Sequence, residues 1–442
     1  MRAGQLRTAG VGTTRVASAV AAVLASLPGI AAAVHLDYSV DAGVERNDNV
    51  AMSAVDPFVE DSFRAGMGFA LTHDTSAIQT SITGRAEYRD YLSDTFADTF
   101  EGTLAGRFNW FAVPERLSFT VEDSLMLQAV NTFVPDSPGN RQQVNVLSVG
   151  PNLYFNLPAQ LRGQAELRYS SADAEITDDF NSQRQSLALR AVKELSTTSQ
   201  VSLNLQGQRI DFDDDSVARD YTRYDVFGRF ARDLAHFALG LDAGYSRLSY
   251  GSGDGDLSEP LLRANVDWLP NRRHRLSMAA SRQFSDAATD ALVGIGGDTT
   301  TMPGPLLVGD AVVNTSPFEE RRLSLGYTFT GSRLQLLVEP YINRLDYVDA
   351  DEFDQDGHGV IFSTTWELRP RLFIGAFTTF DHVDYLQLGV EHETRRYGFH
   401  MQHDWSRHWG SRIEWARHDR RSSVPGDDAS QDTFYLSIIY RR

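Results

Sequence analysis

Residues 100–130 alternate between apolar and polar side chains in two arms joined by a short turn. The first arm carries Leu104 and Phe108 on one parity, and the second carries Leu125 and Leu127. Successive side chains of a strand point to opposite faces, so each arm has one apolar and one polar face. Each arm is about 11 to 14 residues long, roughly twice the usual strand length of ~5–6. This stretch therefore predicts a membrane-spanning β-hairpin.

The hairpin pattern recurs along the chain at a nearly constant interval. Short turns centre near Thr75, Pro114, Pro158, Thr197, Leu234, Pro270, Gly331, Pro370 and His408. The one long interval contains residues 285–317, which we interpret as an insertion. Nine turns with two arms each, plus a first and a last strand, predict about 20 strands. The count is least certain at residues 383–396, where a hairpin could be added or missing, and any even number of strands from about 16 to 20 fits the pattern.

Aromatic residues give a second sign of a membrane barrel. Seven of them precede a short turn by a few residues: Trp110, Phe155, Phe230, Trp268, Phe329, Trp366 and Trp405. Most share the parity of the apolar face, as in a belt at one membrane interface. The predicted fold is all-β, a transmembrane antiparallel up-and-down β-barrel. Longer, acidic or glycine-rich segments between the hairpins are expected on the opposite rim.

The first 33 residues resemble a secretory signal peptide. Three arginines precede a short apolar core, and the small residues Ala31–Ala33 end it. We therefore divide the chain into a signal peptide, 1–33, and an outer-membrane barrel, 34–442, with a long loop at 285–317. Cleavage removes three basic and no acidic residues and changes the net charge from −18 to −21. An exported chain this acidic is a poor candidate for nucleic-acid binding. It contains no cysteine, so disulfides do not stabilise it.

The polar parity of the predicted strands is rich in arginine. In a wide barrel these side chains line the water-filled lumen, where they would form a pathway for an anionic or hydroxylated solute. The alternative, which we favour, is that any polar lumen needs charges of both signs, paired with each other, whatever passes through it. The candidate pathway residues are Arg85, Arg107, Arg162, Arg168, Arg190, Arg229, Arg263 and Arg275.

The sequence gives little support for a metal centre, a cofactor or an active site. Six histidines lie between His382 and His418, but His400 and His403 point to opposite faces of one strand. Residues 349–357 match a calcium loop only loosely, because Phe353 breaks the spacing. No catalytic motif occurs, and we predict that the protein is not an enzyme, with no cofactor and no metal.

The beginning of the predicted barrel resembles a known family. Tyr38-Ser39-Val40 followed by Asn47-Asp48-Asn49-Val50 is similar to the opening of outer-membrane β-barrel, porin-like proteins of bacterial exopolysaccharide and PEP-CTERM gene clusters. The resemblance covers residues 34–442. It implies passage of a secreted polysaccharide across the outer membrane and periplasmic export proteins as partners. It supplies no catalytic residues.

These observations favour an outer-membrane channel for secretion of an exopolysaccharide. Its expected partners are outer-membrane lipid and lipopolysaccharide, the barrel-assembly machinery and periplasmic export proteins, and its expected location is the cell outer membrane. Two alternatives remain: a general diffusion porin and, with less support, a barrel enzyme that acts on lipid or glycan. We also hypothesise that the insertion at 285–317 folds inward as a constriction or plug.

Overall fold

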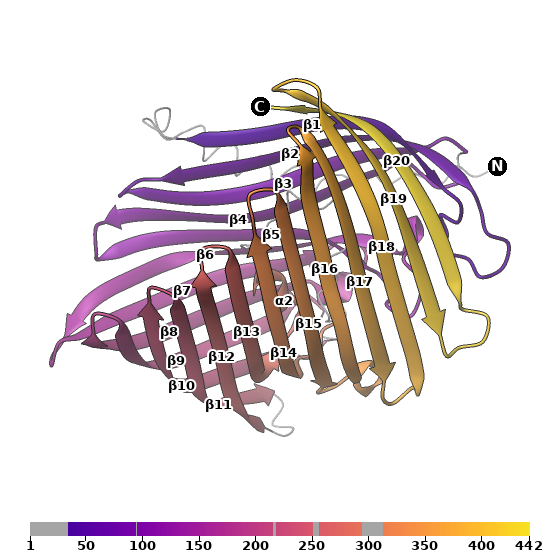
Figure 1. Ribbon diagram of the computed structural model, residues 1–442. Coiled ribbons are helices and arrows are strands. Elements are labelled where there is room, and N and C mark those ends of the chain that lie inside the picture. Colours follow the sequence, from indigo (N-terminus) through magenta and orange to yellow (C-terminus); the bar gives the residue numbers. More distant parts are fainter. Residues whose placement is uncertain (1–33, 94, 215–217, 251–255, 294–312) are drawn as a thin grey trace, which may run out of the picture.

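Twenty long β-strands make up most of the described chain in the computed structural model, which describes residues 34–93, 95–214, 218–250, 256–293 and 313–442 (Figure 1). The predicted signal peptide lies outside the described residues. The strands are β1 (His35–Asn47), β2 (Glu60–Asp74), β3 (Ile78–Tyr91), β4 (Thr99–Val113), β5 (Leu117–Ala129), β6 (Arg141–Leu157), β7 (Leu161–Ala174), β8 (Ser182–Ser196), β9 (Ser199–Phe212), β10 (Tyr221–Leu234), β11 (Phe237–Tyr250), β12 (Leu257–Asn271), β13 (His274–Ser285), β14 (Phe318–Thr330), β15 (Leu334–Tyr347), β16 (Gln355–Arg369), β17 (Leu372–Tyr385), β18 (Val390–Asp404), β19 (Trp409–Ser422) and β20 (Ala429–Arg441).

The strands form one closed barrel. Each strand pairs antiparallel with its neighbours in sequence, and β1 closes the barrel against β20, with Ser39 opposite Arg441 and Asn47 opposite Thr433. Closure gives the backbone groups of the first and last strands hydrogen-bond partners, as a bilayer requires. The predicted fold class and the best estimate of 20 strands are confirmed.

The two rims of the barrel differ in the length of their connections. All nine predicted short turns lie on the rim where β1 begins and β20 ends. The longer segments lie on the opposite rim, which we call the outer rim. It carries one exception, the four-residue connection 386–389 between β17 and β18. This connection settles the undecided region at 383–396, which forms one ordinary hairpin.

The outer surface of the barrel is apolar and carries the predicted aromatic belt. Trp110, Trp268, Trp366 and Trp405 are each about half exposed, at 46–51%. Phe155 is exposed to a similar extent, whereas Phe230 and Phe329 are half-buried. A barrel has an apolar solvent outside and a polar one inside, so exposed apolar side chains mark the lipid-facing surface.

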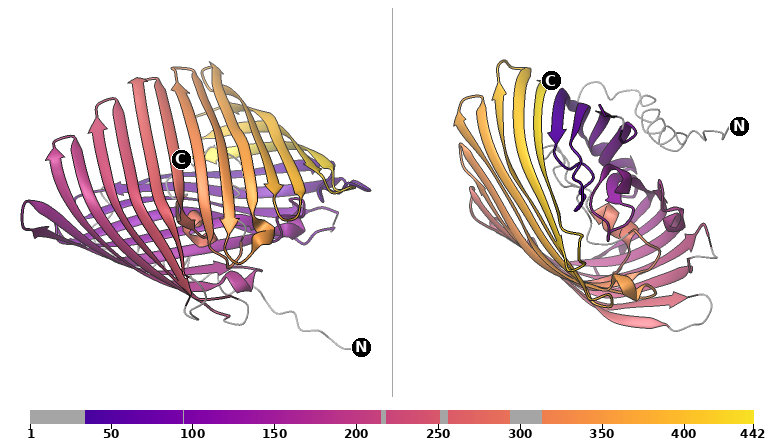
Figure 2. Two further views of the ribbon diagram at one scale, coloured as in Figure 1. Left: turned by 90° about the horizontal axis from the view of Figure 1, so that it is seen from below. Right: turned by 90° about the vertical axis from the view of Figure 1, so that its right-hand side faces the viewer.

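Short helical segments from the outer rim lie between the two walls of the barrel (Figure 2). They are α2 (Ala287–Val293), η2 (Pro138–Asn140), η3 (Asp178–Phe180) and η4 (Asp351–Phe353). No helix in the described part of the chain is long and apolar enough to cross a membrane. An apolar cluster joins α2 to strands on both sides, through Val146 of β6, Ala172 of β7 and Phe318 of β14. The outer end of the barrel is thus packed from within.

Candidate channel lumen

All eight predicted arginines lie on the inward parity of their strands, and seven form ion pairs with carboxylates. The pairs are Arg85 with Asp41 and Glu87, Arg107 with Glu122, Arg162 with Glu194, Arg168 with Glu166, Arg229 and Arg263 with Asp242, and Arg275 with Asp267. The eighth, Arg190, donates from Nε to Oδ1 of Asn204 at 2.8 Å. The side chains therefore form a lining of mutually paired charges, which agrees with the alternative that any polar lumen needs charges of both signs. Whether they also contact a passing solute is a separate question.

The densest charge network covers β1, β2 and β3. Arg64 donates from Nη2 to Oε2 of Glu87 at 2.8 Å and is also paired with Glu45, and its side chain is 11% exposed. Arg89 reaches both Glu45 and Glu87, at 3.1 and 3.3 Å. These groups share the inward face because Glu45, Arg64, Glu87 and Arg89 all follow the polar parity of their strands. The network holds the first three strands together on the lumen side.

A second group of charges links β10, β11 and β12. Asp242 lies between two guanidinium groups, 3.7 Å from Arg229 and 3.1 Å from Arg263. The guanidinium carbon of Arg263 also lies 4.7 Å from the ring centroid of Phe227, within cation–π range. One carboxylate shared by two arginines leaves this part of the wall locally cationic.

The loop between β5 and β6, residues 130–140, crosses the lumen toward the far wall. The ring of Phe133 lies 4.8 Å from the ring of Tyr385 on β17, and its carbonyl accepts a 2.6 Å hydrogen bond from Nη2 of Arg420 on β19. Asp136 of the same loop accepts two hydrogen bonds from Arg141, at 2.6 and 2.9 Å. Burial alone raises the pKa of Asp136, but the Arg141 charge and these hydrogen bonds outweigh it and hold the pKa below its usual range.

A polar cavity lies under this loop. Its lining includes four guanidinium groups and three carboxylates: Arg64, Arg89, Arg141, Arg396, Glu45, Asp136 and Glu414. None of these arginines was among the predicted pathway residues. Arg64, Arg89 and Arg396 were detectable, because each has the polar parity of a predicted strand. The position of Arg141 was not, since it depends on the path of the loop.

The described start of the 285–317 insertion also lies inside the barrel. α2 contacts the outer ends of β5 and β6, and Ala287, Ala288 and Ala291 are fully buried there. Asp286 anchors the helix by pairing with Arg184 of β8, and its side chain also accepts from the backbone N–H of Ala288. Residues 294–312 lie outside the described residues.

The Asp286 carboxylate is held in its charged form. Burial raises its pKa, but the Arg184 charge, with contributions from Arg223 and a hydrogen bond from Thr289, lowers it below its usual range. This carboxylate thus links a helix inside the lumen to a strand five positions away along the barrel wall. Sequence spacing gives no hint of such a contact.

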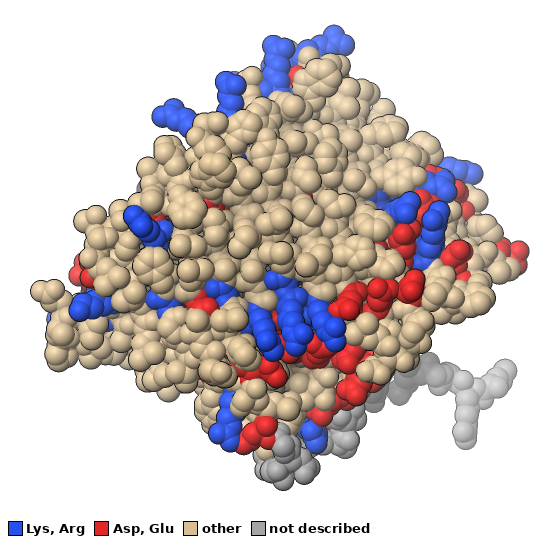
Figure 3. Space-filling model, turned by 60° about the horizontal axis from the view of Figure 1, so that its bottom comes forward, with Lys and Arg blue, Asp and Glu red and all other residues tan. Residues whose placement is uncertain are grey.

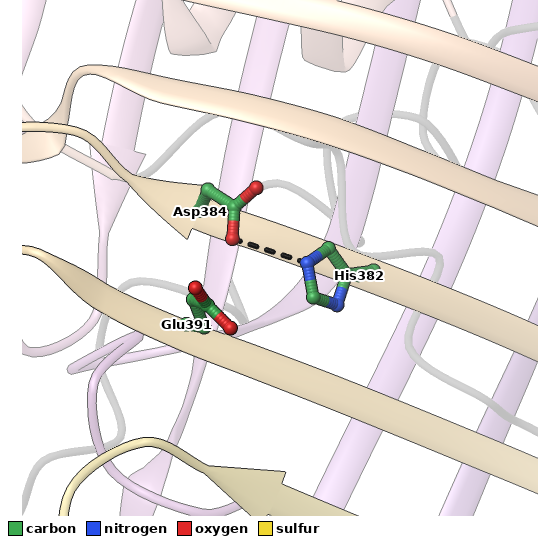
Figure 4. A group of neighbouring side chains, drawn as sticks. All are labelled: His382, Asp384 and Glu391. Atoms are coloured by element: carbon green, nitrogen blue, oxygen red, sulfur yellow. Dashed lines mark hydrogen bonds and ion pairs between the residues drawn. The ribbon is translucent and has the colours of Figure 1, made fainter.

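The histidines of β18 and the acidic loop 349–357 gave little sign of a metal site in the sequence, and the structure places them as follows. His400 and His403 do lie on opposite parities of β18. In the acidic loop, Asp354 accepts a 2.6 Å hydrogen bond from the backbone N–H of Tyr347, and Asp349 pairs with Arg219 at 3.0 Å. These carboxylates therefore have protein partners. Elsewhere, on the outer face, His382, Asp384 and Glu391 come together at the outer rim (Figure 4).

Comparison with known proteins shows similarity to solved structures. No protein-family model and no curated protein sequence matches the chain. A mutant of the ferric enterobactin receptor PfeA from Pseudomonas aeruginosa aligns over 92% of this chain and 80% of its own, with 9% identity and a TM-score of 0.45. OccAB4 from Acinetobacter baumannii aligns over 94% and 100%, with 11% identity and a TM-score of 0.35. OpdO from Pseudomonas aeruginosa aligns over 93% and 97%, with 12% identity and a TM-score of 0.39.

The closed 20-stranded barrel with an apolar, aromatic-belted outer surface and a charged interior is itself the architecture of an outer-membrane protein. The chain is an outer-membrane β-barrel.

Proposed function

We propose that the protein is an outer-membrane channel that secretes an exopolysaccharide. The observation that carries this proposal is the lumen lining of mutually paired arginines and carboxylates. A paired guanidinium still has N–H donors to spare for a sugar hydroxyl, because it has five. Pairing also prevents a strong field of one sign from trapping an acidic polymer. Many weak contacts are what conduction requires.

The size of the barrel supports passage of an extended polymer. Barrels of about 16–18 strands already leave an aqueous channel, and this one has 20. The β5–β6 loop and α2, the described start of the β13–β14 connection, lie inside the outer end and narrow the exit. A polymer entering at the short-turn rim would meet the charged wall first and the narrowed end last.

The two rims would then serve different partners. The short-turn rim faces the periplasm, where exopolysaccharide export proteins would deliver the polymer. The barrel-assembly machinery would recognise the terminal strand β20, which exposes Phe434, Leu436 and Ile438 on its outer face. Lipopolysaccharide would surround the outer rim. The balanced lumen charge also fits the second candidate, a general diffusion porin for small solutes.

Deleting the gene and measuring polysaccharide in the medium separates the two candidates. We expect loss of secreted polysaccharide with retention in the periplasm, and recovery when the wild-type gene is restored. A porin predicts normal secretion together with slower uptake of small solutes. Unchanged secretion in the deletion strain refutes the proposal.

A further inference from the structure

A row of six charged side chains runs around the outer surface of the barrel near the outer rim. The residues lie directly opposite one another on six successive strands, β13 to β18. In order they are Arg282, Arg321, Arg344, Asp356, Asp384 and Glu391. The row therefore has three adjacent cations followed by three adjacent carboxylates. We call it the outer charge row.

The six side chains share the parity of the lipid-facing residues. Arg321 has the same parity as Leu325 on β14, Arg344 the same as Ile342 on β15, and Glu391 the same as Phe399 on β18. All three apolar residues are about half exposed. Figure 3 shows charged side chains gathered in a band below a broad uncharged surface. Charges also occupy the lipid-facing parity of β18 and β19 near the same rim, for example Arg395 and Arg417, so this end of the outer surface needs a polar environment outside the barrel.

The height of the row matches the lipid headgroups. Arg321 lies eight residues from Phe329 of the aromatic belt, and Asp356 lies ten residues from Trp366. With a rise of about 3.3 Å per residue and a tilt of about 40°, these separations are about 20 to 25 Å. The apolar band of an outer-membrane barrel is about 25 Å tall. The row thus lies where the outer leaflet presents its headgroups.

The cationic half of the row is held in place by carboxylates on the side of the loops. Arg282 and Arg321 both reach Glu319, at 2.5 and 2.7 Å, and Arg344 reaches Asp346 at 2.9 Å. Even a guanidinium bonded twice to a carboxylate retains three N–H donors, and its planar fork suits a phosphate. Three such groups on adjacent strands, about 5 Å apart, form a preorganised surface for phosphate oxygens.

The acidic half is short of positive charge. Asp384 lies directly opposite both Asp356 and Glu391, an arrangement that is unfavourable for like charges. Asp356 lies 3.7 Å from Arg344, while Asp384 has His382 at 3.1 Å. Ligand atoms of His382, Asp384 and Glu391 lie within 4.8 Å of one another and point together from two neighbouring strands (Figure 4). Two carboxylates and an imidazole suit a divalent cation.

We propose that the outer charge row binds the phosphorylated headgroup of an outer-leaflet lipid. Its arginines hold phosphate directly, and a divalent cation at His382, Asp384 and Glu391 bridges the acidic half to a second phosphate. A headgroup with two separated phosphates, as in lipid A, satisfies both halves. The binding site is independent of the transported solute, because it lies on the opposite face of the wall from the lumen.

Binding of fluorescent lipid A to the refolded barrel in detergent micelles tests the arginines. The triple variant Arg282→Gln, Arg321→Gln, Arg344→Gln should bind at least about tenfold more weakly, because the phosphate loses three charged hydrogen-bond donors. The single variant Arg344→Gln serves if the triple variant does not fold. The control Arg162→Gln, Glu194→Gln removes a lumen pair and should bind normally. Normal binding by the folded arginine variants overturns the proposal.

Mn²⁺ titration followed by electron paramagnetic resonance tests the acidic half without lipid. The wild type should bind Mn²⁺, and Asp384→Asn with Glu391→Gln should lose this binding and the EDTA sensitivity of lipid A binding. Mn²⁺ binding that persists in this variant, or lipid A binding to the wild type that EDTA leaves unchanged, overturns the cation bridge.

Discussion

Neutralising Asp286 should release α2 from the lumen. This carboxylate and its partner Arg184 have side chains that are only 5% and 4% exposed. Asp286→Asn retains the size of the side chain and an oxygen for the N–H groups of Ala288 and Thr289. It removes the charge, and leaves the Arg184 guanidinium buried without its counter-ion.

The energies favour release. Removing one partner of a buried ion pair costs about 3–5 kcal/mol, because the other charge is left uncompensated. The opposing contribution is apolar: Ala287, Ala288 and Ala291 bury one methyl group each, and Leu292 packs half-buried against the same cluster. At about 0.8 kcal/mol per buried carbon the methyl groups contribute about 2.4 kcal/mol, and the leucine adds roughly 1 kcal/mol. Over most of its range of about 3–5 kcal/mol, the penalty exceeds this apolar contribution, and movement of the helix lets water reach Arg184.

Single-channel conductance in planar bilayers measures the result. We expect Asp286→Asn to conduct more than the wild type, because the described part of the insertion narrows the outer end. The double variant Arg184→Met, Asp286→Asn removes both charges and should restore the lower conductance. The reasoning fails if folded Asp286→Asn conducts like the wild type, or if the double variant conducts as much as the single one.

Three further expectations concern the barrel wall and its loops. Glu45→Gln leaves Arg64 and Arg89 without one of their carboxylate partners, and it should lower the free energy of unfolding by about 3–5 kcal/mol in urea titrations. The control Glu122→Gln lies beside the half-exposed Arg107 and should lower it by about 1 kcal/mol or less. Gly150→Ala should destabilise the barrel by about 1–3 kcal/mol, because its Cβ would lie 1.8 Å from the carbonyl oxygen of Leu167, and Gly139→Ala, which meets open space, should be neutral in the same titration. The pKa of Asp286 in the folded protein lies below the usual aspartate value, so its ion pair with Arg184 is complete above the usual value and is lost only as the pH falls through the folded pKa. Conductance should therefore stay constant from neutral pH to about pH 5 and rise only in stronger acid.

The strands were predictable because lipid outside and water inside impose a period of two on every strand. Leu104 and Arg107 belong to opposite faces by their parity alone, and the structure places them so. Each short turn was visible as a break in this alternation. The same reasoning placed eight arginines on the lumen face, although their mutual pairing with carboxylates required the register between strands.

Contacts made by the loops could not be predicted from the sequence, because loops lack the two-residue alternation of the strands. The pairing of Arg184 with Asp286 joins residues 102 positions apart and five strands apart. Phe133 likewise meets Tyr385 across the barrel. The outer charge row left one detectable sign, namely charges such as Arg321 on the apolar parity. Its order of three cations and three carboxylates emerges only when six strands are set in register.

The separation of cations from carboxylates in the outer charge row suggests a partner that presents both negative and positive groups. Alternating Arg282, Arg321 and Arg344 with the three carboxylates would have satisfied all six charges between neighbouring strands, at about 0.2–1 kcal/mol per pair. The observed order forgoes most of these pairs and retains only the junction of Arg344 with Asp356, at 3.7 Å. In the isolated barrel the arginines depend on Glu319 and Asp346 instead, whereas the adjacent carboxylates of the acidic half repel one another. A cation on the acidic half would relieve this repulsion, and phosphate would use the free donors of the arginines. Exchanging Arg321 with Asp384 should therefore weaken the binding of lipid A, and unchanged binding by the folded variant would show that the row serves the barrel alone.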